Sequence, residues 1–329
     1  MVLIIFFKVL SFFVPVIILY CVDFVSVTYF QQRWRPDLQQ NSNPLLFRGI
    51  IRCVGLEQSG LFYKNGTVMT KTKMAIHSAT KFYETRSGSV HALDKVSIDV
   101  REGEFLCILG PSGCGKSTLL WSMSGLHALS DGEIKLGSET ITEPHPEIAM
   151  IFQDANLLPW RNLAKNIALP FELKRKQPDQ ARINSLLERV NLKGFENKFP
   201  RELSGGMQQR ASIVRSLAVD PSVLLMDEPF GALDAFTRDE MNLLIQEIWM
   251  ETRKTIVFVT HSISEAIFLA DRVVVMSARP GRIASIYDID IPRPRPVEIQ
   301  TKPDFIARVL EIKGSIDHGR DASAGLAIT

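Results

Sequence analysis

The 329-residue sequence has few cysteines and almost no excess of either charge, and each shortage excludes a class of protein. The four cysteines, at positions 21, 53, 107 and 114, form neither a CxxC pair nor a Cys/His cluster with metal-ligand spacing. This argues against a disulfide framework and against a zinc site. The net charge of +2 gives no overall field that would attract a nucleic acid. The chain also shows no internal repeat, and its composition is that of an ordinary globular protein.

The first 30 residues are strongly hydrophobic. From Val2 to Phe30 the chain is long enough to cross a bilayer core, and the arginines that follow would keep the rest of the chain cytoplasmic. A signal-peptide layout is absent. Residues 31–68 show neither helix nor strand periodicity. Two interpretations of residues 1–68 stay open: a segment with a single transmembrane helix, or upstream sequence included by a wrong start codon ahead of Met69.

Residues 69–290 have the pattern of an α/β domain. Alternating runs between Ile76 and Val100, split by a turn at 86–89, predict antiparallel strands. Continuous apolar runs, typical of buried parallel strands, are found at 105–109, 223–226, 255–259 and 272–276. Helical patterns alternate with them at 205–218, 237–252 and 263–270. We therefore expect a mostly parallel sheet with helices on both faces and a ligand at the carboxyl ends of its strands.

Two segments flank or interrupt this core. Residues 157–203 are rich in helical patterns, such as the apolar face of residues 182–190. The proline-rich run at 290–296 cannot lie inside a sheet, so it is expected to end the core. Residues 291–329 are then a C-terminal tail, in which 303–316 are expected to form one helix.

Residues 110–118 fit the P-loop pattern, between an apolar strand and a helical stretch. Its glycines let backbone N–H groups surround phosphate oxygens at a helix N-terminus, which favours anions. Lys116 supplies a charge for the β- and γ-phosphates of ATP, Ser117 a hydroxyl for Mg²⁺, and Thr118 a further phosphate contact. The expected phosphate-binding residues are Gly110, Pro111, Ser112, Gly113, Cys114, Gly115, Lys116, Ser117 and Thr118. Because thiolate pKa values fall near helix N-termini and lysines, Cys114 is expected to be reactive.

Two carboxylates follow the apolar run at 223–226. Asp227 is placed to hold Mg²⁺, and Glu228 is a candidate general base for the attacking water. Gln153 follows another apolar stretch and offers an amide to Mg²⁺ or to that water. His261 follows the strand at 255–259, where a lone histidine is more often a surface or core residue than a catalytic one. The expected magnesium ligands are Ser117, Gln153 and Asp227, and the expected catalytic residues are Glu228, His261 and Gln153.

The segment Leu203–Gly206 begins a helix. Ser204 is suited to cap that helix, and Gly205 and Gly206 expose their amides with no Cβ in the way. Alone this pattern indicates only a capped helix. In a chain that also has a P-loop, it indicates a second phosphate-binding element.

Taken in order, these motifs resemble the ATP-binding subunit of an ABC transporter over roughly residues 70–290. The motifs are the P-loop, Gln153, Leu203–Gly206, Asp227-Glu228, Ala232-Leu233-Asp234 and Thr260-His261. The resemblance implies an α/β fold: a P-loop NTPase core with a mostly parallel sheet, an antiparallel β subdomain and a helical signature subdomain. It also implies a head-to-tail homodimer with two ATP molecules between the subunits.

The same resemblance implies roles for individual residues. Ser204 and Gly206 bind the γ-phosphate of the ATP held by the partner's Lys116, His261 contacts the γ-phosphate in its own subunit, and Asp234 links the two sites. An aromatic residue upstream of the P-loop stacks on adenine; Tyr83 fits best, with Phe82 as the neighbouring choice. Met207 departs from the commonest signature, which has Gln there, and this puts the fine geometry of the segment in doubt.

Residues 156–162 and 270–281 are similar to the importer branch for nitrate, aliphatic sulfonates and taurine. This narrower resemblance implies a peripheral protein on the cytoplasmic face of the cell membrane, working with two permease subunits and an external solute-binding protein. In that family the surface after Gln153 meets a cytoplasmic helix of the permease, so these residues identify the branch and not the solute.

Two alternative classes of protein predict different sequence features. An ABC-type ATPase acting on DNA would carry long coiled coils between the P-loop and the signature, whereas Lys116 and Ser204 are separated by a stretch without sustained heptads. A ribosomal member would usually carry two cassettes. A regulatory nucleotide-binding module without turnover is disfavoured by the intact Glu228 and His261. ATPase assays and co-purification with a permease separate the three classes.

Overall fold

The computed structural model describes residues 61–64, 67–86, 88–277 and 280–324. The described residues belong to one compact unit, Gly60–Thr329. The hydrophobic segment at the start of the chain, with its expected transmembrane helix, lies outside the described residues. Within the described ranges, no helix combines the length and the hydrophobicity needed to cross a membrane. The expected domain start at residue 69 falls inside strand β2 (Thr67–Thr70), which pairs with β1 (Leu61–Lys64).

Six strands form the central sheet in the order β12-β11-β5-β10-β9-β8. The parallel strands are β5 (Phe105–Leu109), β8 (Ile148–Ile151), β9 (Val223–Asp227), β10 (Thr255–Thr260) and β11 (Arg272–Ser277). β12 (Arg282–Asp288) runs antiparallel along one edge. Every residue of β5, β9 and β10 is buried, which explains their continuous apolar runs.

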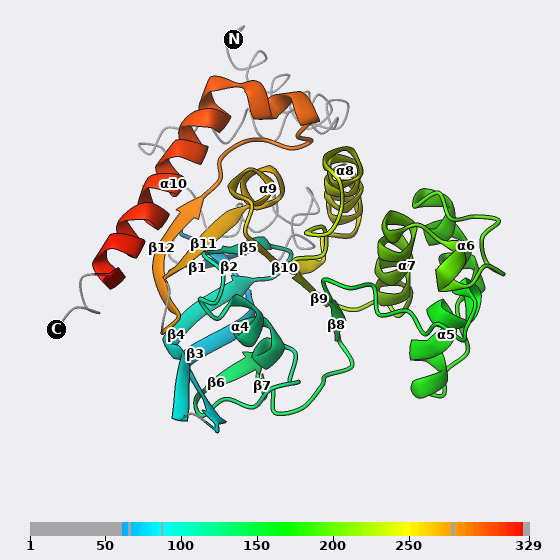
Figure 1. The fold of residues 1–329 in the computed structure, drawn as a ribbon, viewed down its shortest axis with the longest axis horizontal. Helices are drawn as coiled ribbons and strands as arrows, with labels where there is room; N and C mark the ends of the chain where they lie inside the picture. Colours follow the sequence, from blue (N-terminus) through cyan, green and yellow to red (C-terminus); the bar gives the residue numbers. More distant parts are fainter. Residues whose placement is uncertain (1–60, 65–66, 87, 278–279, 325–329) are drawn as a thin grey trace, which may run out of the picture. The chain divides into compact units, whose positions relative to one another are not determined.

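The two faces of this sheet are covered differently (Figure 1). Helices α8 (Ala235–Thr252) and α9 (Ile263–Leu269) pack on one face, and α4 (Lys116–Met123) packs on the other. Alternate residues of β5 enter the two cores: Phe105 and Cys107 join α8 and α9, whereas Leu106 and Ile108 join α4. The expected mostly parallel sheet with helices on both faces is confirmed.

A second, antiparallel sheet completes the core on the α4 side. Its strands lie in the order β4-β3-β6-β7. Their bounds are β3 (Thr72–Thr85), β4 (Gly88–Arg101), β6 (Asp131–Leu136) and β7 (Glu139–Thr140). The β3–β4 hairpin was predicted from alternation in the sequence, with its turn at the predicted place.

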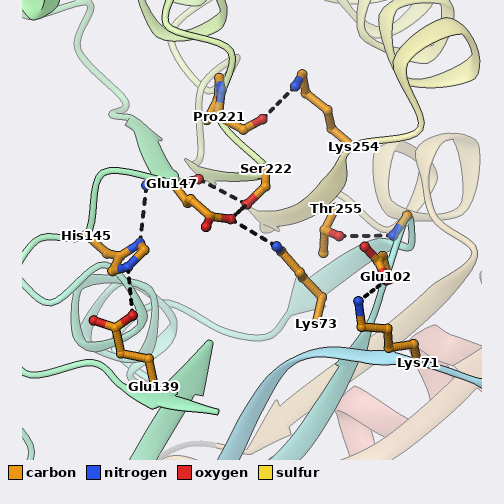
Figure 2. Close-up of polar contacts among 11 residues, drawn as sticks. Lys71, Lys73, Glu102, Glu139, His145, Glu147, Pro221, Ser222, Lys254 and Thr255 are labelled. Carbon is orange, nitrogen blue, oxygen red and sulfur yellow. Dashed lines mark hydrogen bonds and ion pairs between the residues drawn. The ribbon is translucent and has the colours of Figure 1, made fainter. Parts of the chain in front are cut away.

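Polar contacts join the two sheets at the amino ends of the parallel strands (Figure 2). Glu147, just before β8, accepts hydrogen bonds from Lys73 Nζ of β3 at 3.1 Å and from Ser222 Oγ at 2.5 Å. These two contacts, Ser222 first, lower the pKa of the Glu147 carboxyl. The candidate site lies at the other end of these strands, their carboxyl ends.

Three helices form a separate group beside β8 (Figure 1). They are α5 (Leu163–Leu173), α6 (Gln180–Arg189) and α7 (Gly205–Ala218). Each begins at a side chain that accepts a backbone hydrogen bond, namely Asn162, Asp179 and Ser204, as helix N-caps do. The predicted helical subdomain is therefore present, and Ser204 is the N-cap that the sequence indicated.

The C-terminal segment belongs to the core. After β12 the chain forms a short 3₁₀ helix, η4 (Val297–Thr301), and then α10 (Pro303–Ala324), which extends beyond the predicted 303–316. Phe305 and Ile312 of α10 are buried in the core that contains α8 and α9. The expectation that the core ends at 290–296 is wrong. That segment is excluded from a sheet by its prolines, but its Arg295 side chain is fully buried among helix carbonyls.

Candidate nucleotide-binding site

Four loops that carry candidate functional residues follow four neighbouring strands. β5, β10, β9 and β8 are adjacent and parallel, so the residues after them share the carboxyl edge of the sheet. The P-loop follows β5, His261 follows β10, Glu228 follows β9, and Gln153 comes just after β8. Sheet topology therefore brings together residues that are far apart in the sequence.

The P-loop fits closely around the start of α4. Gly115 is the helix N-cap with φ 92°, and a Cβ there would lie 2.8 Å from the carbonyl oxygen of Ala92. Both the left-handed conformation and the close approach require glycine. Lys116 is 5% exposed, and its Nζ donates to the carbonyls of Gly110 at 2.9 Å and Pro111 at 3.1 Å. The ammonium group is therefore held over the loop that would cradle the phosphates.

Cys114 does not have the environment that the sequence suggested. Its side chain is fully buried in the core shared with α4. Burial raises the pKa of the Cys114 thiol, and the opposing effect of Lys116 is smaller. The prediction of a reactive thiol is wrong, because the desolvation of a thiolate outweighs the effect of its position at a helix N-terminus.

Ser117 and Asp227 form the centre of a fitting magnesium site. Ser117 Oγ donates to Asp227 Oδ1 at 2.9 Å, and Asp227 is 7% exposed. Burial raises the pKa of the Asp227 carboxyl, the Ser117 hydrogen bond lowers it, and the neighbouring Glu228 raises it. A divalent cation between hydroxyl and carboxylate would compensate this buried charge.

Gln153 and Glu228 both lie near Gly231. A side-chain carbon built at Gly231 would lie 3.6 Å from Gln153 Nε2 and 3.8 Å from Glu228 Oε2. The residues described contain no cluster of three His, Cys, Asp or Glu side chains able to hold a metal unaided. One carboxylate, one hydroxyl and one amide nonetheless suit Mg²⁺, which takes its other ligands from substrate phosphates and water.

Glu228 lies between Lys116 and His261. Its Oε1 is 3.7 Å from Lys116 Nζ, and its Oε2 is 2.8 Å from His261 Nδ1. The backbone of Glu228 has φ 44°, a left-handed conformation that costs on the order of 1–3 kcal/mol and is often found at functional sites. The structure thus brings the candidate base, Lys116 of the P-loop and His261 into one cluster.

The two candidate adenine-stacking residues have different neighbours. Tyr83 Oη is 2.7 Å from His127 Nδ1, and the Tyr83 ring meets the His127 ring edge-on. Phe82 is 41% exposed and stacks on His91 with ring centroids 4.1 Å apart. The stacking role of Tyr83, with Phe82 as alternative, stays a prediction.

The signature segment lies on the helical group. Ser204 and Gly205 are exposed at the start of α7, where Ser204 Oγ accepts from Met207 N at 3.3 Å. A Cβ at Gly206 would lie 3.0 Å from Thr237 Cγ2, close to Asp234, the N-cap of α8. The segment therefore exposes backbone amides to solvent, as it must if it is to bind a phosphate held by a second subunit.

Comparisons with known proteins agree with this geometry. A family model described as ABC transporter matches residues 93–231. The taurine import ATP-binding protein TauB of Rhizobium johnstonii is 47% identical over 223 residues, 67% of this chain and 85% of that protein. The chain belongs to the ABC transporter ATP-binding family. The aliphatic sulfonates import ATP-binding protein SsuB of Bacillus cereus is 41% identical over 238 residues, 72% of this chain and 94% of that protein.

Solved structures support the same assignment for this ABC ATPase. The ATP-binding cassette MJ0796, in a dimeric post-hydrolysis state bound to ADP and phosphate, is 30% identical with a TM-score of 0.60. The match covers 67% of this chain and 100% of the cassette. The predicted P-loop NTPase fold is confirmed, and family membership makes ATP hydrolysis the activity of this chain.

Two residues of α7 that sequence reasoning missed hold the loop on both sides of Gln153 in this ABC ATPase. Gln209 Nε2 donates to the Phe152 carbonyl at 3.2 Å, and Arg215 donates to the carbonyls of Ala155 and Asn156, both at 2.8 Å. Burial lowers the pKa of the Arg215 guanidinium. The available sequence signal was a glutamine and an arginine among the apolar positions of a predicted helix.

Gly281 is a third residue whose role was missed. A Cβ at Gly281 would lie 2.1 Å from the carbonyl oxygen of Cys114, and Gly281 N donates to Ala92 O at 3.0 Å. The end of the 270–281 segment, which marked the importer branch, therefore packs directly against the P-loop.

Proposed function

We propose that this chain is the ATP-hydrolysing subunit of an importer for a small solute, with organic sulfonates such as taurine favoured over nitrate. The observation that carries the proposal is a set of candidate catalytic residues gathered at one edge of the sheet, in a chain 41% and 47% identical to sulfonate and taurine import proteins over most of their lengths. The subunit would lie on the cytoplasmic face of the membrane. Its partners would be two permease subunits that receive solute from an external binding protein.

In this proposal the P-loop amides and Lys116 bind the ATP phosphates, and Tyr83 stacks on adenine. Ser117, Asp227 and Gln153 would hold Mg²⁺, which neutralises charge on the phosphates and orients them when bound. Each of these residues acts before any bond breaks, by fixing the γ-phosphate against the carboxyl edge of the sheet.

Glu228 and His261 would act on the reaction itself. Glu228 accepts a proton from the attacking water, which Gln153 helps to orient beside it. His261, 2.8 Å from Glu228, contacts the γ-phosphate and fixes the carboxylate on that side. Lys116 stabilises the charge that develops on the transferred phosphoryl group.

The site would be completed by a second copy of the chain. Ser204 and Gly205 are exposed at the start of α7 and Gly206 is partly exposed, so their amides are available to the γ-phosphate of ATP bound by the partner. Asp234, at the start of α8, would link the two sites. A similar cassette forms a dimer with ADP and phosphate bound, which supports this arrangement.

A complementation experiment tests the shared site. Lys116→Ala impairs ATP binding in its own chain, and Ser204→Arg blocks the γ-phosphate held by the opposite chain. A mixed dimer places both defects in one site and leaves the other intact, so activity should return although each variant alone is inactive. Complete inactivity of a verified mixed dimer, together with a monomeric Glu228→Gln protein at saturating ATP, would overturn the model.

The solute requires a separate experiment. The chain should co-purify with its permease. In vesicles that contain this complex and the binding protein, adding taurine or an alkanesulfonate should raise the rate of ATP hydrolysis. Nitrate at the same concentration is the matched control. Stimulation by nitrate alone would reassign the solute while leaving the ATPase assignment intact.

A further inference from the structure

The last turn of α9 is capped by two arginines from the C-terminal segment. A helix end leaves up to four carbonyl groups without partners inside the helix. Arg295 Nη1 donates to the carbonyls of Ile267 at 2.7 Å, Phe268 at 3.0 Å and Ala270 at 2.9 Å. Arg293 Nη2 donates to the carbonyl of Leu269. Four consecutive carbonyls at the end of α9 are therefore bound by two side chains from a segment more than twenty residues later.

Arg295 is committed to this cap. It is 1% exposed, and its remaining described guanidinium hydrogen bonds go to the carbonyl of Ile291. Its backbone is held by α8: Arg295 N donates to Gln246 Oε1 at 2.8 Å, and Gln246 Nε2 donates to Arg295 O at 2.9 Å. Burial lowers the pKa of Arg295 to about 9, and the helix C-terminus offers the partial negative charge that such a cation needs.

The other end of α9 carries the turn with His261. Ser262 is the N-cap of α9 and accepts from Glu265 N at 3.3 Å. Thr260 Oγ1 accepts from Ser262 N at 3.0 Å and donates to the carboxylate of Glu265. The turn from Thr260 to Ser262 is thus tied to the first turn of α9. That helix has only seven residues, so about 10 Å separate His261 from the arginine cap.

We propose that Arg293 and Arg295 are positioning residues for His261. The two arginines fix the position of α9 and thereby hold the His261–Glu228 contact at the other end of that helix. The proposal rests on the proposed role of His261 at the γ-phosphate. A short, buried helix held at both ends moves as one body, so a shift at its capped end displaces the turn at its other end. The arginines touch no substrate, and their proposed effect on His261 passes through α9; Arg293 also pairs with Asp271 and lies over the Trp249 ring.

The experiment uses the full chain with Arg293→Gln and Arg295→Met, and Arg295→Lys as the conservative variant. Arg308→Met is the matched control, because Arg308 belongs to the same C-terminal segment but its described hydrogen bond goes to Glu311 of its own helix, α10. Measured quantities are kcat, and the Kd values for ADP and for a non-hydrolysable ATP analogue.

Both cap variants should lower kcat about 10- to 100-fold, the effect of a small misplacement of a catalytic group. They should weaken binding of the ATP analogue, while the Kd for ADP stays within about twofold of that of the unmodified chain, because only the γ-phosphate contact is displaced. Arg295→Lys should recover part of the loss. If Arg295→Met does not fold, Arg293→Gln carries the test, since it leaves Arg295 in place. Equal loss of ADP and ATP-analogue affinity, or the same pattern in Arg308→Met, would overturn the proposal.

Combination with His261→Ala separates this inference from the proposed function. If the arginines act through His261, then Arg293→Gln has no further effect on kcat in the His261→Ala chain. Multiplicative losses in the double variant overturn the positioning role alone. A fully active His261→Ala chain would overturn the proposed role of His261, and this inference with it.

Discussion

Glu265 shows how one buried carboxyl can make stability depend on pH. The residue is 7% exposed, and burial raises its pKa above the ordinary 4.5, with the Thr260 hydrogen bond as the largest opposing effect. A carboxyl with a raised folded-state pKa contributes stability that is fully present below the unfolded pKa. That contribution is lost as the pH rises through the folded-state pKa. At higher pH the folded protein must hold a charge that the unfolded chain gives to water.

Glu265→Gln should therefore raise the melting temperature at pH 8, because it keeps an oxygen that accepts from Thr260 and removes the charge. The gain over the unmodified chain should shrink as the pH is lowered toward 4.5. Thermal unfolding across this pH range measures the difference. Glu247→Gln, at an exposed position on α8, is the control and should show no such trend. A gain from Glu265→Gln that is independent of pH would contradict the explanation.

Cys114 gives a second prediction at this scale. Because its thiol is fully buried and its pKa is raised, iodoacetamide at pH 7.5 should modify it at least about tenfold more slowly in the folded chain than in urea. Mass spectrometry of the P-loop peptide follows the reaction, and ATPase activity should persist while the peptide stays unmodified. Rapid alkylation of the folded protein would show that the loop opens to solvent.

The positions of candidate residues could be predicted where chemistry and local sequence coincide, and their roles stay predictions. Gly115, Asp227 and Glu228 follow from a loop pattern and from an apolar strand that ends in two carboxylates. Arg293 and Arg295 could not be found this way, because their partners are helix carbonyls, which have no residue signature. Burial of Cys114 was missed for a related reason: a loop pattern does not show which side chain points into the core.

At the scale of elements, local periodicity predicted α7 and β5 to the residue. The edge strand β12 was missed because it is antiparallel and alternates between intermediate and exposed positions, so no apolar run marks it. The continuation of the core into α10 was missed because the prolines before it signal an end of sheet structure. They do not signal an end of packing.

The loop before α5 illustrates how one side chain can define an element. Asn166 is fully buried, and its Oδ1 accepts from Leu158 N at 2.7 Å. Its Nδ2 donates to the carbonyls of Leu158, Arg161 and Asn162. A single amide thus replaces the regular hydrogen bonds that this loop lacks. It also supports the segment that carries Trp160, which is 71% exposed.

Asn166→Leu should lower the free energy of unfolding by about 2–4 kcal/mol, because buried backbone groups lose their partners. Asn184→Leu is the matched control, since Asn184 is exposed on α6 and should change stability by less than about 0.5 kcal/mol. Urea unfolding of both variants measures the difference. Equal effects would show that the loop does not depend on this amide.

At the scale of the whole molecule, the C-terminal segment ties the sheet to its helical face. Phe305 and Ile312 are buried in the same core as α8 and α9, and Arg295 connects that core to the end of α9. Full burial of each apolar side chain contributes roughly 1.5–3 kcal/mol. A domain is stable by only about 5–15 kcal/mol in total, so the segment supplies a large share.

Two truncations measure that share. A chain ending at Asp290 should be insoluble or unfolded at 25 °C, because α9 loses its carbonyl partners and the core loses the apolar side chains of α10. A chain ending at Ile316 keeps Phe305, Ile312 and both arginines, so its melting temperature should fall by no more than a few degrees, equivalent to about 1 kcal/mol. Soluble yield and thermal unfolding distinguish the two. If the shorter chain folds and binds ATP as tightly as the longer one, the segment is an appendage and the core ends at β12.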